Sequence, residues 1–144
     1  MGTSTPELLD VYQKQIRSVF EMAVPVWEPG LSKEEVKQLE RVQKTAFHVI
    51  LGEGYTGYQR SLTVLDCETL KNRRVQICLN FANKALRHPK YSSWFTENKV
   101  NTDKVQPNTR GPKSKPTVLK PVPHRTNRYR DSPLPYLTSL LNSQ

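Results

Sequence analysis

Large apolar side chains recur at helical spacing through residues 1–95 and then almost stop, and this break limits the fold more than any other feature of the chain. A repeat every three or four positions is typical of one buried face of an α-helix. A core of roughly 90 residues is small but sufficient for a domain that folds alone. We therefore predict a mostly α protein, with a small antiparallel helical domain over residues 1–95.

Two long helices are expected in the first half of the chain, and capping residues mark their ends. The first starts with Thr5 as the cap and Pro6 at the first helical position, and Pro25 stops it. The second starts at a capping box formed by Ser32 and Glu35, and residue 52, a glycine, ends it. Because the connection is short, the two helices should pack antiparallel.

A third long helix is expected to open at Asp66 or Cys67 and to end at Pro89, after a shorter helix near residues 58–65. One face is apolar, and the other face carries basic side chains, which are Lys71, Arg73, Arg74, Lys84 and Arg87. Arg73 and Arg74 are adjacent, so only one of them can fully face solvent. The basic face is either a stripe that positions phosphates or an ordinary solvated surface. The aromatic residues after it, which are Tyr91, Trp94 and Phe95, are expected to fold back onto the core.

Residues 96–131 change character, because they are rich in Pro, Lys, Arg, Asn and Thr and hold few large apolar side chains. Such a segment buries too little surface to offset its loss of conformational entropy, so we expect a disordered basic linker with polyproline-like pieces. Residues 132–144 recover a helical pattern. Ser132 is a cap, Pro133 takes the first helical position, and the leucines form one apolar face, at Leu134, Leu137, Leu140 and Leu141.

The net charge of +9 and the sequence pI of about 9.7 favour a polyanionic partner. Residues 96–144 carry 9 basic and 3 acidic side chains, a net of +6, whereas residues 1–95 carry 13 and 10. The predicted nucleic-acid contacts of the tail are Lys113, Lys115, Lys120, Arg125, Arg128, Tyr129 and Arg130. Tyr129 lies among arginines and is suited to stack on an unpaired base. The alternatives are a basic surface without a partner and a plain basic linker.

The residues that catalysis and metal binding need are scattered, so we expect no enzyme activity, no cofactor, no metal and no small-molecule substrate. The chain has no Asp-Asp pair, and His48, His88 and His124 lie far apart. The glycines at 52–57 lack the Gly-Lys-Ser/Thr of a phosphate-binding loop. The sequence shows no signal peptide and no membrane-spanning stretch, and its two cysteines are expected to be free thiols. These features favour the cytoplasm or the nucleus.

The order and spacing of several motifs resemble a recurring block of non-LTR (LINE-type) retrotransposon reverse transcriptases. The matching residues include Leu9, Tyr12, Ile16-Arg17, Val19, Glu21, Ala23, Pro25-Val26-Trp27 and Pro29. Further similarity lies in 39–52, in Asn72-Arg73-Arg74, and in 125–142. Ser18, Met22 and His48 depart from the residues common there, and His48 lacks the fixed positive charge of the usual arginine.

In that family this region follows the palm, in or beyond the thumb, and the palm carries the catalytic aspartates. The resemblance therefore implies a non-catalytic C-terminal fragment or remnant of an RNA-directed DNA polymerase, which binds RNA or DNA. It also implies the missing palm domain as a partner. An alternative from another class is a protein-interaction module that docks through the leucine face at 134–141.

Overall fold

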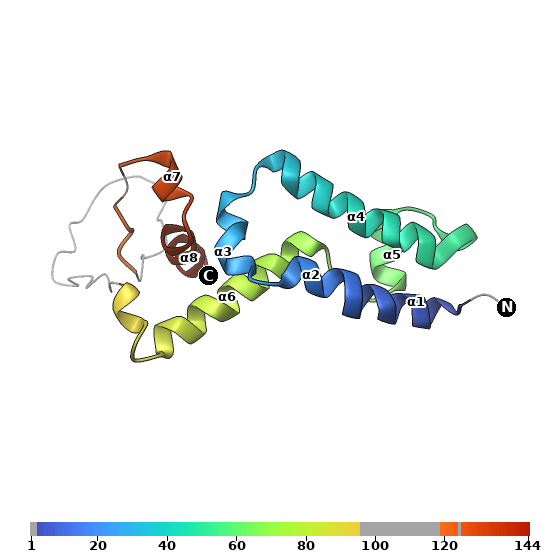
Figure 1. Ribbon diagram of the computed structural model, residues 1–144, viewed down its shortest axis with the longest axis horizontal. Helices are drawn as coiled ribbons and strands as arrows, with labels where there is room; N and C mark the ends of the chain where they lie inside the picture. The colour runs from blue at the N-terminus through green and yellow to red at the C-terminus, as the bar shows by residue number, and fades with distance from the viewer. Residues whose placement is uncertain (1–2, 96–118, 124) are drawn as a thin grey trace, which may run out of the picture. The chain divides into compact units, whose positions relative to one another are not determined.

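The computed structural model describes residues 3–95, 119–123 and 125–144 (Figure 1). Every regular element among these residues is helical, so the mostly α prediction is confirmed. The chain divides into two compact units, residues 1–78 and 79–144. Helix α6 (Leu70–Arg87) contains the division and contributes to both units. The predicted folding of residues 1–95 as one domain stays a prediction.

The first unit begins with a helical run that is α-helical over α1 (Thr5–Val11), π-helical over η1 (Tyr12–Arg17) and α-helical again over α2 (Ser18–Glu21). Its cap is Ser4, not Thr5; the Ser4 N–H donates to the Glu7 carboxylate at 2.9 Å. The run also ends earlier than predicted.

The break falls at Met22 and Ala23 rather than at Pro25, because Met22 is extended and Ala23 is left-handed, with a φ of 54°. The indole N–H of Trp27 donates to the Met22 carbonyl at 2.8 Å and so satisfies a carbonyl that the break frees from the helix. Pro25 lies in the first turn of a new short helix, α3 (Val24–Trp27), which the 3₁₀ turn η2 (Glu28–Gly30) follows. Proline is well placed there, because the first-turn N–H groups have no partner inside a helix.

Helix α4 (Lys33–Leu51) confirms both of its predicted ends. The Ser32 N–H donates to Glu35 Oε2 at 2.8 Å, and the Glu35 N–H donates to Ser32 Oγ at 3.3 Å, as in a capping box. Gly52 follows at a φ of +51°, where a side chain would be strained. The 3₁₀ turn η3 (Gly52–Gly54) then leads to α5 (Tyr58–Val64).

The core of the first unit lies where α1, η1, α4 and α5 meet, and α4 runs antiparallel to the first helical run as predicted (Figure 1). Its buried side chains are Tyr12, Phe47, Ile50, Leu62 and Leu65. The rings of Tyr12 and Phe47 meet edge to face with centroids 5.6 Å apart, a favourable aromatic geometry. Other apolar residues at the same helical period, Val11, Val42 and Val49, stay exposed beside a groove between these helices.

The second unit contains the end of α6, the 3₁₀ turn η4 (Ser92–Trp94), α7 (Asn127–Arg130) and α8 (Pro133–Asn142). Helix α8 confirms the predicted C-terminal helix, with Ser132 at the cap position and Pro133 in the first turn. Phe95 is buried, as expected, but Trp94 remains 48% exposed, so the expectation that it folds onto the core is wrong. The backbone turn after α6 aims consecutive side chains in different directions, and only one of the two rings is covered.

Part of the predicted linker is ordered. Leu119 is buried, its N–H donates to Asn142 Oδ1 at 2.9 Å, and its carbonyl accepts from Asn142 Nδ2 at 3.0 Å. Helix α7 was not predicted; the Thr126 hydroxyl caps it by accepting from the Tyr129 N–H at 3.3 Å. The predicted disorder over 96–118 lies outside the described residues.

Candidate nucleic-acid interface

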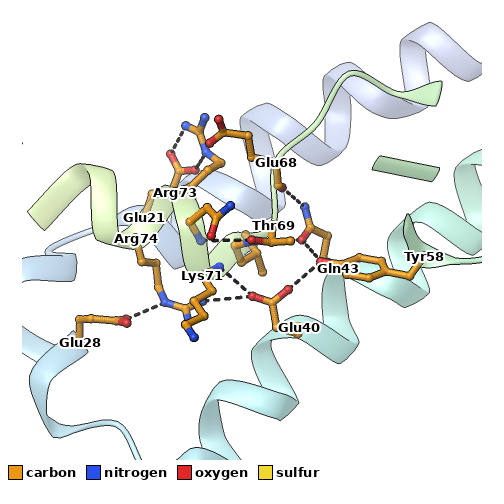
Figure 2. Close-up of polar contacts among 12 residues, drawn as sticks. Glu21, Glu28, Glu40, Gln43, Tyr58, Glu68, Thr69, Lys71, Arg73 and Arg74 are labelled. Atoms are coloured by element: carbon orange, nitrogen blue, oxygen red, sulfur yellow. Dashed lines mark hydrogen bonds and ion pairs between the residues drawn. The ribbon is translucent and has the colours of Figure 1, made fainter. Parts of the chain in front are cut away.

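The basic face predicted on α6 splits into two parts with different surroundings. Its N-terminal part, from Lys71 to Arg74, lies in a network of polar contacts with α2, η2, α4 and α5 (Figure 2). Its C-terminal part, Lys84 and Arg87, is exposed. The two parts therefore differ in how accessible they are to a phosphate backbone.

The start of α6 is fixed by side chains of α4, which explains why the helix begins at Leu70 and not at Asp66 or Cys67. Gln43 Oε1 accepts from the Leu70 N–H at 3.1 Å, and Glu40 Oε1 accepts from the Lys71 N–H at 2.7 Å. The Thr69 hydroxyl accepts from the Asn72 N–H at 3.2 Å. These three acceptors satisfy first-turn N–H groups that have no partner inside the helix.

Gln43 is buried and uses both ends of its amide in this network. Its Nε2 donates to the Glu68 carbonyl at 3.0 Å, while its Oε1 accepts from the start of α6. The Tyr58 hydroxyl lies 2.6 Å from Glu40 Oε2 and 2.7 Å from Gln43 Oε1, and it donates its proton to one of them (Figure 2). Burial, reinforced by the Glu40 carboxylate, raises the pKa of Tyr58 far above its ordinary value. The network is a structural device that joins α4, α5 and α6.

Arg74 does not lie on the solvated face where the sequence placed it. Its side chain is 1% exposed, and its Nε donates to Glu28 Oε2 at 2.6 Å. A second carboxylate oxygen, Glu40 Oε1, lies 3.9 Å from its Nη1. Only one of the adjacent Arg73 and Arg74 was expected to face solvent fully, and Arg74 is the buried one, because Glu28, 46 positions earlier in the chain, supplies its counter-ion. Arg74 is closed to a phosphate in this structure.

Arg73 is only partly exposed and is also held by a carboxylate. Its Nε and Nη2 both donate to Glu21, the latter at 3.1 Å, in the two-pronged geometry that suits a guanidinium. This hydrogen bonding raises the pKa of Arg73. Arg17 lies one turn before Glu21, with its Nε 3.4 Å from the same carboxylate. Lys71 is exposed, and only its backbone N–H takes part in the network.

The net charge of the chain lies entirely in the second unit. Residues 1–78 contain 10 basic and 10 acidic side chains and so carry no net charge. Residues 79–144 contain 12 basic and 3 acidic side chains, a net of +9, which equals the charge of the whole chain. Several basic side chains of the first unit form ion pairs within that unit. The second unit has only 3 acidic side chains with which its 12 basic side chains could pair.

The described basic side chains of the second unit are on its surface. Those among the predicted contacts that are exposed are Lys84, Arg87, Lys120, Arg125, Arg128 and Arg130. Tyr129 is 45% exposed. Arg130 pairs with Asp131 at 2.9 Å, and Asp131 is the one acidic residue among the described residues of this unit. Lys113 and Lys115 lie outside the described residues.

One exposed basic residue, Lys90, was not among the predicted contacts. It follows Pro89, where the helical pattern ends, and its Nζ lies over the Tyr91 ring, 5.7 Å from the centroid. The alternation of basic and aromatic residues from Arg87 to Trp94 is the signal in the sequence that would have identified it.

The described residues contain no group of three or more His, Cys, Asp or Glu side chains that could hold a metal ion. Cys67 and Cys78 are free, as predicted, and burial raises the pKa of the Cys78 thiol to about 11. No helix in the described part of the chain has the length and apolarity that crossing a membrane requires.

Comparison of the chain with known protein families, with curated proteins and with solved structures finds no match.

Proposed function

We propose that this protein is a non-catalytic module that binds the backbone of RNA or DNA through residues 79–144. The observation that carries the proposal is the placement of the entire net charge of +9 in this unit. The first unit is neutral and holds Arg73 and Arg74 in ion pairs, so it supplies structure rather than contacts.

The physical basis is the release of counterions. A nucleic acid carries condensed cations, and each Lys or Arg that neutralises a phosphate releases some of them. Exposed side chains without a nearby carboxylate are best suited to this role, because they lose no internal ion pair on binding. Arg125 and Arg128 are exposed, whereas Arg130 must first leave Asp131.

The test is a salt titration of a labelled single-stranded oligonucleotide with the full chain and two double variants. Arg125→Ala/Arg128→Ala should weaken binding to all sequences alike and should flatten the log–log salt slope by about 1.4, since each contact contributes about 0.7 for a single strand. The matched control, Lys33→Ala/Arg60→Ala, removes the same charge from exposed positions of the neutral unit and should change the slope little. Equal effects of the two double variants would contradict the proposal.

We further propose, from the resemblance in sequence, that the chain corresponds to the region after the palm of a non-LTR retrotransposon reverse transcriptase. On this proposal it helps the polymerase hold its RNA template or DNA target, its protein partner is the palm domain, and it works in the nucleus or cytoplasm. Sequencing the genomic region directly upstream of the Met1 codon tests this. A palm-coding region with paired aspartates in frame would support the proposal, and unrelated sequence there would contradict it.

The alternative of a protein-interaction module has less support at the leucine face of α8. Leu137 is 2% exposed and the neighbouring Thr138 is buried, so the centre of that face is already covered. If the alternative holds, changing Leu137 and Leu141 to Ala abolishes binding of a partner, and salt has little effect.

A further inference from the structure

We propose that the segment after α6 forms a stacking site for an unpaired base, so that this protein prefers single-stranded to duplex nucleic acid. The inference rests on the proposed function and adds the substrate class and the residues that select it. It starts from three rings, those of His88, Tyr91 and Trp94, which lie in sequence order along the turn that leads into η4.

The three rings form a stepped aromatic surface, in which each ring is tilted against the next, by 31° between His88 and Tyr91 and by 50° between Tyr91 and Trp94. The centroids of His88 and Tyr91 are 4.7 Å apart, and those of Tyr91 and Trp94 are 4.8 Å apart. The backbone fixes this spacing: the Tyr91 N–H donates to the His88 carbonyl at 3.0 Å, and the Trp94 N–H donates to the Tyr91 carbonyl at 3.0 Å. His88 Nδ1 also accepts from the Lys90 N–H at 3.2 Å. The rings are therefore positioned before any ligand arrives, which reduces the entropy lost on binding.

The outer end of this surface is open. Trp94 is 48% exposed, although the next residue, Phe95, is 6% exposed and anchors the segment. When another flat apolar surface covers a large aromatic ring that was in contact with water, the free energy of the system falls. Nucleic-acid bases have such a surface, and their stacking on aromatic side chains tolerates any base.

Positive charge surrounds the rings on the chain segment that carries them. Lys84, Arg87 and Lys90 are exposed, and the one acidic residue of the described second unit, Asp131, pairs with Arg130. Lys84 and Arg87 also line a polar hollow of about 540 Å³ on α6, together with Asn80, Asn83 and Gln144. Cationic and amide side chains in a hollow are donors suited to phosphate and sugar oxygens.

These features favour a nucleic acid over a protein partner with an apolar surface, because such a surface offers no anionic or hydrogen-bond-accepting group to the three neighbouring cations and to the hollow lined by amides. They also favour a single strand. In a duplex the bases stack on one another and pair, so their faces are closed to a side chain, whereas unpaired bases are free to stack.

The test uses the full chain, a 12-nucleotide labelled single strand, the matching duplex, and a strand of the same length with abasic sites in place of its bases. Trp94→Ala should weaken binding of the ordinary strand about 5- to 150-fold, without changing the salt slope. It should leave binding of the abasic strand nearly unchanged, since that ligand keeps the phosphates and lacks the bases. Trp94→Phe should keep most of the affinity, whereas Trp94→Leu, which keeps apolar bulk without an aromatic face, should behave like Trp94→Ala.

Other outcomes separate this inference from the proposed function. Salt-sensitive binding by the wild type that Trp94→Ala does not weaken would overturn the stacking site and leave the proposed function standing. Equal affinity of the wild type for the single strand and the duplex would do the same. No binding of any of the three ligands at about 50 mM salt, a concentration low enough for counterion release to favour association, would overturn both proposals. A circular dichroism melt of each variant confirms that the fold is kept.

Discussion

The buried ion pair between Arg74 and Glu28 gives the sharpest prediction about stability. The Arg74 guanidinium is 1% exposed and its Nε donates to Glu28 at 2.6 Å. Glu28→Gln keeps the shape of the side chain but leaves the guanidinium without its full counter-charge. Removing one partner of a buried pair typically costs about 3–5 kcal/mol, because a charge then stays buried without its partner. Glu40 Oε1, 3.9 Å from Arg74 Nη1, would remain as a more distant counter-charge. For a chain of this size that cost lowers the thermal midpoint by about 10–20 °C.

A second variant tests whether the cost comes from the stranded charge. Glu28→Gln/Arg74→Met removes both charges and keeps the volume, and it should recover at least about 2 kcal/mol relative to Glu28→Gln alone. The control is Glu34→Gln, which breaks an exposed pair with Lys37, whose atoms lie 3.2 Å apart, and should move the midpoint little.

The assay is urea and thermal unfolding of the full chain, followed by circular dichroism at 222 nm. A Glu28→Gln variant within about 1 kcal/mol of the wild type would mean that the pair is not buried in solution, because a cost that small is what an exposed ion pair gives. The double variant also tests function, since Glu28→Gln/Arg74→Met should leave the salt slope of oligonucleotide binding unchanged.

Three further predictions concern the first unit. Hydrogen bonds from Ser32 lower the pKa of Glu35 from its ordinary 4.5, so the stabilisation that the ionised carboxylate gives is present above about pH 4.5 and is lost as the pH falls through the lowered pKa of the folded state. Glu35→Gln should therefore reduce the pH dependence of the free energy of unfolding between pH 5 and 3. A pH dependence equal to that of the wild type would argue against the capping box. At pH 8, Cys67 should react with a disulfide reagent in the native protein. Cys78 should react only after unfolding, because it is buried and burial raises the pKa of its thiol to about 11. Equal reaction rates of the two thiols in the native protein would contradict this prediction. Gln43→Leu should lower the free energy of unfolding in urea by about 2 kcal/mol or more, because it leaves buried backbone groups without a partner; a smaller loss would mean that water reaches them.

The sequence predicted those helix ends that are determined by residues within one helical turn. The capping box at Ser32 and Glu35 and the stop at Gly52 depend on residues within one turn, so the sequence was enough. The start of α6 depends on acceptors from α4, which are 27 and 31 positions away from the N–H groups that they bind. No local pattern carries that information, and the predicted start was too early.

The candidate site shows the same difference between features that depend on local sequence and features that depend on distant residues. Charge counts identified the basic C-terminal half, because a count needs no fold. They did not distinguish Arg74, which is buried, from Lys84, which is exposed, although both fall on the basic side of the helical pattern. The partner of Arg74 comes from η2, and only the folded chain brings it there. From the sequence, Trp94 and Phe95 were both expected to fold back onto the core, whereas in the structure Phe95 is covered and Trp94 is 48% exposed.

If the second unit binds a polyanion through counterion release, the affinity of the wild-type chain for nucleic acid must depend on salt. The affinity for a labelled single-stranded oligonucleotide should fall as salt rises, and if about five side chains contact phosphates, the log–log slope should be between about −3 and −4. A slope near zero, or no binding at about 50 mM salt, would contradict the account.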